Sequence, residues 1–247
     1  MIKVIQLIKS FIILLIGVIF LIVTFPLGLI AWIFSDKDKY AHPSKFGVIV
    51  LQFLAKFFCK ISGCRYHIEG QENIPKDPAV YVGNHQGDYD AFLILFALGE
   101  PKIIMAKKEI KVVPIANIWM MVIKCIFVDR KNKVKAKESM MSSIDYVKHG
   151  RSVLYFAEGT RSQGPQLGPF KGGAFKTAVT TGTQIVPFVI EGSYKVYEEN
   201  RYLKTSDVYF HILPSVPVST EDDPREVSDK VRNLIQDELI RIREKDQ

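Results

Sequence analysis

The architecture of this 247-residue chain is most clearly indicated by the segment Ala79-Val80-Tyr81-Val82-Gly83-Asn84-His85-Gln86-Gly87-Asp88-Tyr89-Asp90. Its apolar first part has the length and composition of a buried strand. A short polar loop follows, and the apolar run that begins at Ala91 predicts a helix. A strand that leads through a loop into a helix is the repeating unit of α/β sheets, and such loops often carry catalytic side chains.

The polar loop contains a histidine and an aspartate whose spacing is informative. On one ideal helix, the side chains of His85 and Asp90 would point about 140° apart. They can therefore meet only if His85 lies in the loop and Asp90 lies in the first turn of the helix. An imidazole held by a carboxylate is a general base, and here no nucleophilic side chain accompanies it. The alternative interpretation is a structural histidine bonded to a carboxylate at the start of a helix.

From about residue 65 onward, short apolar runs alternate with segments of helical length. We predict strands at residues 66–68, 80–82, 103–105, 126–128, 153–156, 185–190 and 208–213. We predict helices at residues 90–98, 115–123, 134–148, 173–181 and 224–243, the last of them packed on the sheet. This alternation indicates an α/β fold with a mixed, largely parallel sheet flanked by helices.

The first 62 residues differ in composition from the rest of the chain. Residues 11–35 contain no ionisable side chain and form a run long enough to cross a bilayer. Pro26 predicts a kink or break in this helix near residues 24–26. A second helix, at about residues 43–61, carries apolar residues at helical spacing and lysines on its other side, a pattern typical of a helix at a membrane surface. The apolar positions are Val48, Leu51, Leu54 and Phe58.

These features predict an N-terminal two-helix membrane-binding motif at residues 1–62 and a catalytic α/β domain at residues 63–247. Two topologies remain open, besides the alternative of a buried core helix. A true span would place the catalytic domain in the cytoplasm, because more lysines follow the apolar run than precede it. Those that follow are Lys37, Lys39, Lys45, Lys56 and Lys60, against Lys3 and Lys9 before it. A motif sunk into one leaflet accounts better for Pro26 and for the amphipathic second helix, and we favour it.

The net charge of +7 indicates an anionic partner, such as a membrane leaflet or an acidic carrier protein. We find no nucleic-acid-binding motif and no basic stripe interleaved with aromatic residues, so the sequence argues against a nucleic-acid partner. The three cysteines have neither disulfide nor zinc spacing, and no His, Cys or carboxylate set has the spacing of a metal site. We therefore expect no metal and no other cofactor.

Four motifs, in a fixed order, resemble those of the glycerolipid acyltransferase family. They are His85-x4-Asp90, Ile126-Phe127-Val128-Asp129-Arg130, Phe156-Ala157-Glu158-Gly159-Thr160-Arg161-Ser162 and Ile185-Val186-Pro187-Phe188-Val189-Ile190. The resemblance covers about residues 79–193. One such motif is weak evidence, but four in order are a specific signal. Two positions depart from the family pattern, since Lys124 stands where the second block usually opens with Gly and Ala157 where the third usually has Pro. Both put the local backbone geometry in question.

The resemblance implies a membrane enzyme of phospholipid biosynthesis that acts at the cytoplasmic face of the cell membrane. It would transfer a fatty acyl group from an acyl thioester to the sn-2 hydroxyl of 1-acyl-sn-glycerol 3-phosphate, or lysophosphatidic acid, giving phosphatidic acid. The donor would be acyl carrier protein or acyl-CoA, and the sequence does not distinguish them. The same blocks serve acylation of glycerol 3-phosphate and of other lysophospholipids. Competing classes are a non-catalytic lipid-binding protein on the same scaffold and a hydrolase that uses water.

The resemblance also implies roles for individual residues. His85 would be the general base, oriented by Asp90. The segment Glu158-Gly159-Thr160-Arg161 would bind the acceptor. The guanidinium of Arg161 can bind a phosphate with two hydrogen bonds, and Gly159 allows the backbone to approach closely. The carboxylate of Glu158 would hold Arg161 or another cation, or contact the glycerol hydroxyl. Lys107 and Arg130, at predicted strand ends, are further candidates for the phosphate. The thioester oxygen is the alternative partner of Lys107. An ordinary solvated side chain is the alternative for each cation.

Overall fold

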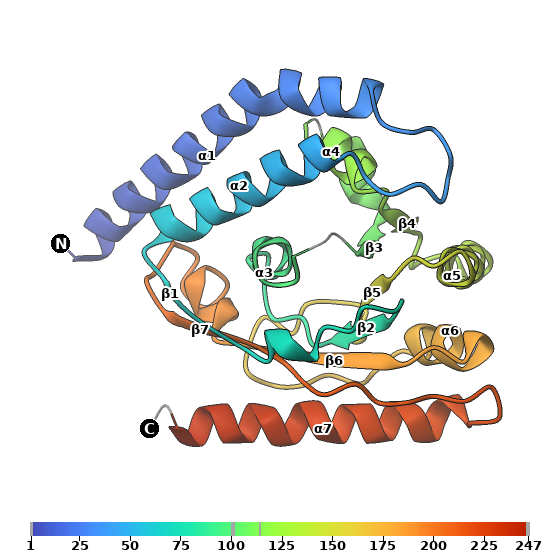
Figure 1. Ribbon diagram of the computed structural model, residues 1–247. Coiled ribbons are helices and arrows are strands. Elements are labelled where there is room, and N and C mark those ends of the chain that lie inside the picture. Colours follow the sequence, from blue (N-terminus) through green and yellow to red (C-terminus); the bar gives the residue numbers. More distant parts are fainter. Residues whose placement is uncertain (1, 100–101, 114, 246–247) are drawn as a thin grey trace.

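A seven-stranded sheet runs through the middle of the molecule (Figure 1). The computed structural model describes residues 2–99, 102–113 and 115–245. The strands are β1 (Arg65–Glu69), β2 (Val80–Gly83), β3 (Ile103–Lys107), β4 (Ile126–Val128), β5 (Val153–Phe156), β6 (Ile185–Glu191) and β7 (Asp207–Ile212). Their order is β1-β7-β6-β2-β5-β3-β4, with every pair parallel except β6 and β7. The predicted mixed, largely parallel sheet is therefore confirmed.

The direction of the strands determines where functional groups can gather. Strands β2, β3, β4, β5 and β6 all run the same way, so their carboxyl ends meet at one edge of the sheet. In open α/β sheets this edge is where ligands bind. The loops after β2 and β5, which carry the first and third motifs, follow two neighbouring strands and therefore lie side by side there.

Helices cover both faces of the sheet (Figure 1). They are α3 (Asp90–Ala97), α4 (Ala116–Val122), α5 (Lys133–Lys148), α6 (Gly173–Thr181) and α7 (Pro224–Lys245), with short 3₁₀ turns η1 (Gln71–Asn73), η2 (Lys108–Val112) and η3 (Ser193–Val196). Because side chains alternate along a strand, Val80 and Val82 pack with α5, α6 and α7, whereas Tyr81 packs with α3. The predicted packing of the C-terminal helix on the sheet is confirmed, since Val231 and Ile235 of α7 belong to the same hydrophobic core as Val80 and Val82.

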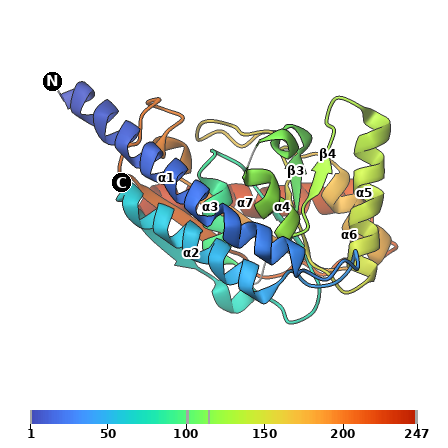
Figure 2. The same cartoon turned by 90° about the horizontal axis from the view of Figure 1, so that it is seen from above.

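The N-terminal helices α1 (Ile2–Ile33) and α2 (Lys45–Ser62) run antiparallel and lie side by side across the α3 and α4 side of the molecule (Figures 1 and 2). Helix α1 continues through Pro26, and Figure 1 shows it bent in its C-terminal part. Proline removes a hydrogen bond to the carbonyl four residues earlier, which explains a bend without a break. Of the two predicted outcomes, the kink is the one observed.

Only one stripe of α1 touches the protein, and it is made largely of small residues. A Cβ atom on Gly17 would lie 2.3 Å from the Phe58 ring, and one on Gly28 would lie 3.1 Å from Trp119. Most of the large apolar side chains elsewhere on α1 are exposed, including Phe11 at 67%. The segment Gln6–Ile33, with a mean hydropathy of 2.9, is long and apolar enough to cross a membrane by length and composition.

The apolar side of helix α2 that the sequence assigns to the membrane surface packs largely against the protein. Of the apolar stripe predicted for the membrane surface, Leu51 and Leu54 are buried in a core shared with Trp119 of α4. A second apolar row is exposed instead, at Phe46, Ile49 and Phe53. The reason is that α2 must cover both α3 and α4, so its regularly spaced apolar stripe turns inward.

The two departures from the family pattern have local explanations. Lys124 has a φ of 56°, in the left-handed region where a glycine is usual, and its Nζ donates to the carbonyl of Asp36 at 3.2 Å. Ala157 donates its main-chain N–H to the carbonyl of Gly83 at 2.9 Å, a bond that proline could not make. The backbone thus keeps the left-handed turn before β4 and ties β5 to the end of β2.

Candidate active site

The loop after β2 brings His85 and Asp90 together as predicted. Asp90 is the first residue of α3 and is fully buried, and its Oδ2 lies 2.7 Å from Nδ1 of His85. The same oxygen accepts the main-chain N–H groups of Gln86 at 2.7 Å and Gly87 at 3.1 Å. Because Oδ2 of Asp90 accepts both of these N–H groups, it also acts as the acceptor in its bond with His85. The imidazole therefore donates through Nδ1, and Nε2 is left to accept a proton.

The imidazole is held from its face as well as from its edge. The ring of Phe156, at the end of β5, stacks on it with 3.8 Å between centroids and 15° between planes. The side chain of His85 is 16% exposed, so a substrate can reach it from only a small part of its surface. Such a restrained ring suits proton transfer, which depends on a fixed approach.

Hydrogen bonds to main-chain atoms join this loop to its neighbours. The side-chain amide of Asn84 accepts from the N–H of Ile190 in β6 at 2.8 Å and donates to the carbonyl of the same residue at 2.7 Å. The N–H groups of Ser162 and Gln163 donate to the carbonyls of His85 at 2.8 Å and Gln86 at 3.1 Å. The loops after β2 and β5 therefore form one unit, a feature that the sequence did not reveal.

Glu158 supports this unit from inside. It is buried, its Oε1 accepts the N–H of His85 at 2.8 Å, and its Oε2 accepts the N–H of Gly168 at 2.8 Å. Burial raises the pKa of the Glu158 carboxyl, and these two N–H groups oppose the shift. Glu158 thus holds two main-chain groups, and it is not the partner that ion-pairs with Arg161. Gly159 adopts a left-handed φ of 69°, and Thr160 is exposed.

Arg161 is engaged by two acidic side chains. Its Nη1 forms an ion pair with Asp88 in the loop after β2, and it lies 3.6 Å from Oε1 of Glu198. Glu198 is buried, and its Oε1 accepts the main-chain N–H of Asp88 at 2.7 Å. Burial raises the pKa of the Glu198 carboxyl. Glu198 was not predicted from the sequence, because it follows η3 in a segment without a motif.

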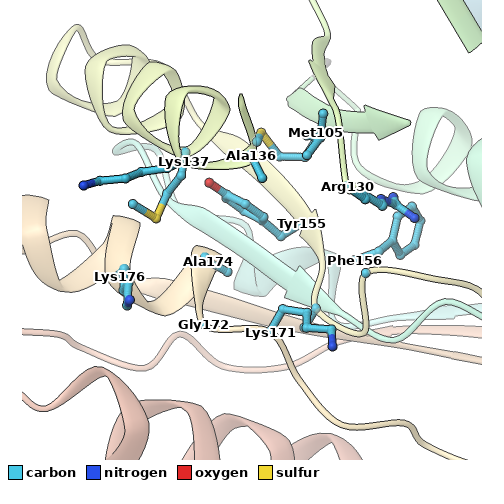
Figure 3. Close-up of a pocket in the computed structure, with 15 residues that line it drawn as sticks. Met105, Arg130, Ala136, Lys137, Tyr155, Phe156, Lys171, Gly172, Ala174 and Lys176 are labelled. Carbon is cyan, nitrogen blue, oxygen red and sulfur yellow. The ribbon is translucent and has the colours of Figure 1, made fainter. Parts of the chain in front are cut away.

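The remaining predicted cations lie at the same edge of the sheet. Lys107 ends β3, is exposed, and lies 3.9 Å from Glu109. Arg130 follows β4 and lines a cleft of about 550 Å³ that Phe156 and Gly159 also border (Figure 3). Among residues 2–99, 102–113 and 115–245, no group of three His, Cys or carboxylate side chains is arranged to hold a metal ion.

The arrangement combines a histidine oriented by a carboxylate, a neighbouring arginine and an adjoining cleft. The sequence profile of the Acyltransferase family matches residues 65–191, just over half of the chain. The chain belongs to the Acyltransferase family. The resemblance found in its motifs is therefore confirmed, and the matched range contains the His85–Asp90 pair and Arg161.

Curated relatives of this acyltransferase cover most of its length. A 1-acyl-sn-glycerol-3-phosphate acyltransferase of Borreliella burgdorferi is 28% identical over 195 residues, covering 78% of this chain and 77% of the relative. One of Salmonella typhimurium is 29% identical over 232 residues, covering 93% and 92%. The crystal structure of the 1-acyl-sn-glycerophosphate (LPA) acyltransferase from Thermotoga maritima matches with a TM-score of 0.84 and 23% identity over 98% of each chain. This likeness confirms the fold.

Proposed function

We propose that this acyltransferase transfers a fatty acyl group from an acyl thioester to the sn-2 hydroxyl of 1-acyl-sn-glycerol 3-phosphate, giving phosphatidic acid. The observation that carries the proposal is the 2.7 Å bond between His85 and Asp90 at the carboxyl edge of the sheet. The activity named for the curated relatives supports the choice of acceptor.

In the proposed reaction the acceptor itself is the nucleophile. Nε2 of His85 takes the proton of the sn-2 hydroxyl while that oxygen attacks the thioester carbonyl. The C–O bond forms, the C–S bond breaks, and the imidazolium returns its proton to the departing thiolate. Asp90 stabilises the imidazolium, as the carboxylate does in a Ser-His-Asp triad. A base placed in this way typically contributes on the order of 10²–10⁴ in rate.

The acceptor phosphate is assigned to Arg161. Its neighbour Asp88 has a side chain that is 73% exposed, so an entering phosphate can displace it at little cost. The phosphate offers two oxygens to a guanidinium, which makes such contacts strong and directional. Gly159 and Thr160 lie in the same loop, and Lys107 and Arg130, at neighbouring strand ends, add positive charge. Glu158 contributes indirectly, by fixing the main chain of His85.

We also propose that residues 1–62 anchor residues 63–247 to the membrane. The exposed apolar side chains of α1 and the exposed row of α2 support this assignment. The acceptor and product are lipids, so the site should lie at the surface of one leaflet, and we place it on the cytoplasmic face. Insertion of both helices into that leaflet remains our preferred topology over a span.

The donor is an acyl thioester of CoA or of acyl carrier protein, and the proposed reaction needs neither a metal nor another cofactor. Acylation of glycerol 3-phosphate or of another lysophospholipid is the alternative within the same chemistry. A non-catalytic lipid-binding protein is the alternative outside it, but it would have no need of the His85–Asp90 pair.

The test is acceptor-dependent release of free thiol, with mass spectrometry of the product from defined donors and acceptors. Wild-type protein should release free thiol from acyl-CoA, or from acyl carrier protein that carries an acyl group, only when lysophosphatidic acid is present. His85→Ala should abolish most turnover while remaining folded, and Asp90→Asn should reduce it on the order of 10²–10⁴-fold. Thiol release without an acceptor would instead identify a hydrolase, and near-normal turnover of a folded His85→Ala variant would refute the role of His85 as the base.

A further inference from the structure

A cleft of about 550 Å³ lies between α5 and α6 and adjoins the catalytic loop (Figure 3). Its floor is largely apolar, with Met105, Val128 and Tyr155 contributed by three strands. Phe156 lines the cleft, and the same ring stacks on His85. The cleft therefore extends to the residue whose ring packs on His85. Its volume is within the range of about 300–1,000 Å³ that is typical of small-molecule sites.

The polar lining of this cleft is strongly positive. Its charged members are Arg130, Lys137, Lys171 and Lys176, and no carboxylate accompanies them among the described lining residues. None of the four forms an ion pair within 4.0 Å in the described part of the chain. Four cations gathered around a concave site without acidic partners create a positive potential that attracts an anion.

The cations occupy both ends of the cleft. In Figure 3, Lys137 and Lys176 lie toward one end, on α5 and α6, whereas Arg130 and Phe156 lie at the other. An apolar floor bounded at its far end by two lysines suits a chain that is mostly uncharged and ends in an anion. A fatty acyl tail ends in an uncharged methyl group, which cannot form an ion pair with the two lysines.

We propose that this cleft binds the 4′-phosphopantetheine arm of the acyl donor, the chain that CoA and acyl carrier proteins have in common. The inference rests on the proposed function, which requires an acyl thioester. The thioester end lies beside Phe156 and His85, the arm crosses the apolar floor, and its phosphate pairs with Lys137 and Lys176. The membrane-facing helices α1 and α2 cover the opposite side of the sheet from α5 and α6 (Figure 1), so the water-soluble donor and the lipid acceptor approach from different sides.

The experiment compares donors that carry the same acyl group on pantetheine, on 4′-phosphopantetheine, on CoA and on acyl carrier protein. The test variant is Lys137→Glu/Lys176→Glu, with Lys137→Ala/Lys176→Ala as a milder second pair. The control is Lys148→Glu, which makes the same charge change at an exposed position of α5 outside the cleft. For each protein, KM of the donor is measured at saturating lysophosphatidic acid.

We expect charge reversal at Lys137 and Lys176 to raise KM for acyl-phosphopantetheine on the order of tenfold, the sum of two lost exposed ion pairs and added repulsion. KM for acyl-pantetheine, which lacks the phosphate, should stay unchanged, and Lys148→Glu should behave as wild type. A comparable rise with both acyl-CoA and acyl carrier protein would support recognition of the shared arm.

Three results would overturn the proposal while leaving the proposed function intact. The first is an unchanged ratio of KM for the two pantetheine donors in the double variant. The second is a loss confined to acyl carrier protein, which would indicate docking of the carrier's surface instead. The third is an altered preference for acyl chain length without an effect on the phosphate, which would make the cleft an acyl slot. Absence of transfer to lysophosphatidic acid from every donor by the wild type would refute the proposed function itself.

Discussion

Arg161 donates to the carboxylate of Asp88, so the cation that we assign to the acceptor phosphate is already engaged. The Asp88 side chain is 73% exposed and belongs to the same loop as His85. A carboxylate and a phosphate cannot both use the same guanidinium nitrogens fully, so the two compete. In the proposed complex, Asp88 therefore competes with the acceptor phosphate for Arg161.

We expect Asp88→Asn to lower KM for lysophosphatidic acid about two- to fivefold, which corresponds to the ~0.5–1 kcal/mol that an exposed ion pair contributes. KM for the acyl donor should not change. Steady-state kinetics with each substrate varied in turn make the comparison. A higher KM for lysophosphatidic acid in this variant would mean that Asp88 positions Arg161 for the acceptor and does not compete with it.

Glu198 connects Arg161 to the loop that carries His85. Its Oε1 accepts the N–H of Asp88, and its carboxylate packs so closely on Gly87 that a Cβ there would lie 2.6 Å from Oε2. Glu198→Ala should reduce kcat roughly tenfold, because the partly buried main-chain N–H of Asp88 loses its partner and the loop gains freedom. Glu198→Gln, which keeps an acceptor oxygen, should restore most of this loss. Equal damage by the two variants would show that the negative charge matters more than the hydrogen bond.

Glu158 needs both of its oxygens as acceptors, one for the N–H of His85 and one for the N–H of Gly168. In Glu158→Gln, one oxygen becomes an amide NH₂, which cannot accept. We expect this variant to lose about 1 kcal/mol of unfolding free energy, because one partly buried main-chain donor is left unpaired, and to lose kcat as well. Urea unfolding and steady-state kinetics measure the two effects. Unchanged values for both would show that the two N–H groups can find other partners.

Metal removal provides a simple test of the proposed chemistry. Because His85 supplies the base and the proposed reaction routes no step through an ion, dialysis against EDTA should leave the initial rate unchanged. Activity that disappears with the chelator and returns with one particular divalent ion would overturn a mechanism based on His85 alone.

The membrane topology can be tested with one introduced cysteine. The variant Ile2→Cys, in a background that lacks Cys59, Cys64 and Cys125, is placed in oriented vesicles and treated with an impermeant thiol reagent. With both helices in one leaflet, the reagent should label the cysteine only from the side on which the catalytic domain lies. Labelling from the opposite side would establish a span. A cysteine placed at Lys230, on the exposed surface of α7, reports the side of the catalytic domain.

The contrast between His85 and Glu198 shows how much of the site could be predicted from the sequence. His85 and Asp90 are five residues apart, and the change from an apolar run to a polar loop to a helix fixed their relative placement. The positions of the strands followed from the same local periodicity, whereas their order in the sheet did not. Glu198 meets Asp88 across 110 residues of chain, and nothing in its own neighbourhood indicates that contact.

A similar limit applies to α2 and to Glu158. The apolar spacing of Leu51 and Leu54 predicted a helix with one apolar side, but periodicity cannot say whether that side meets a protein or a lipid. The motif around Glu158 identified the residue, while its partners depended on how the loop after β5 folds back. Contacts that arise only when distant segments meet were therefore the ones that the sequence left out.

The bonds that join Ser162 to His85 and Gln163 to Gln86 use only main-chain atoms. Any amino acid except proline supplies the same N–H at position 162, so the side chain there can change without removing the bond to His85. Position 163 is more restricted, because Gln163 has a left-handed φ of 56° that favours glycine or asparagine. Two members of the family could therefore differ at position 162 and still hold the histidine loop in the same place. A count of identical residues would then understate how alike their proposed sites are.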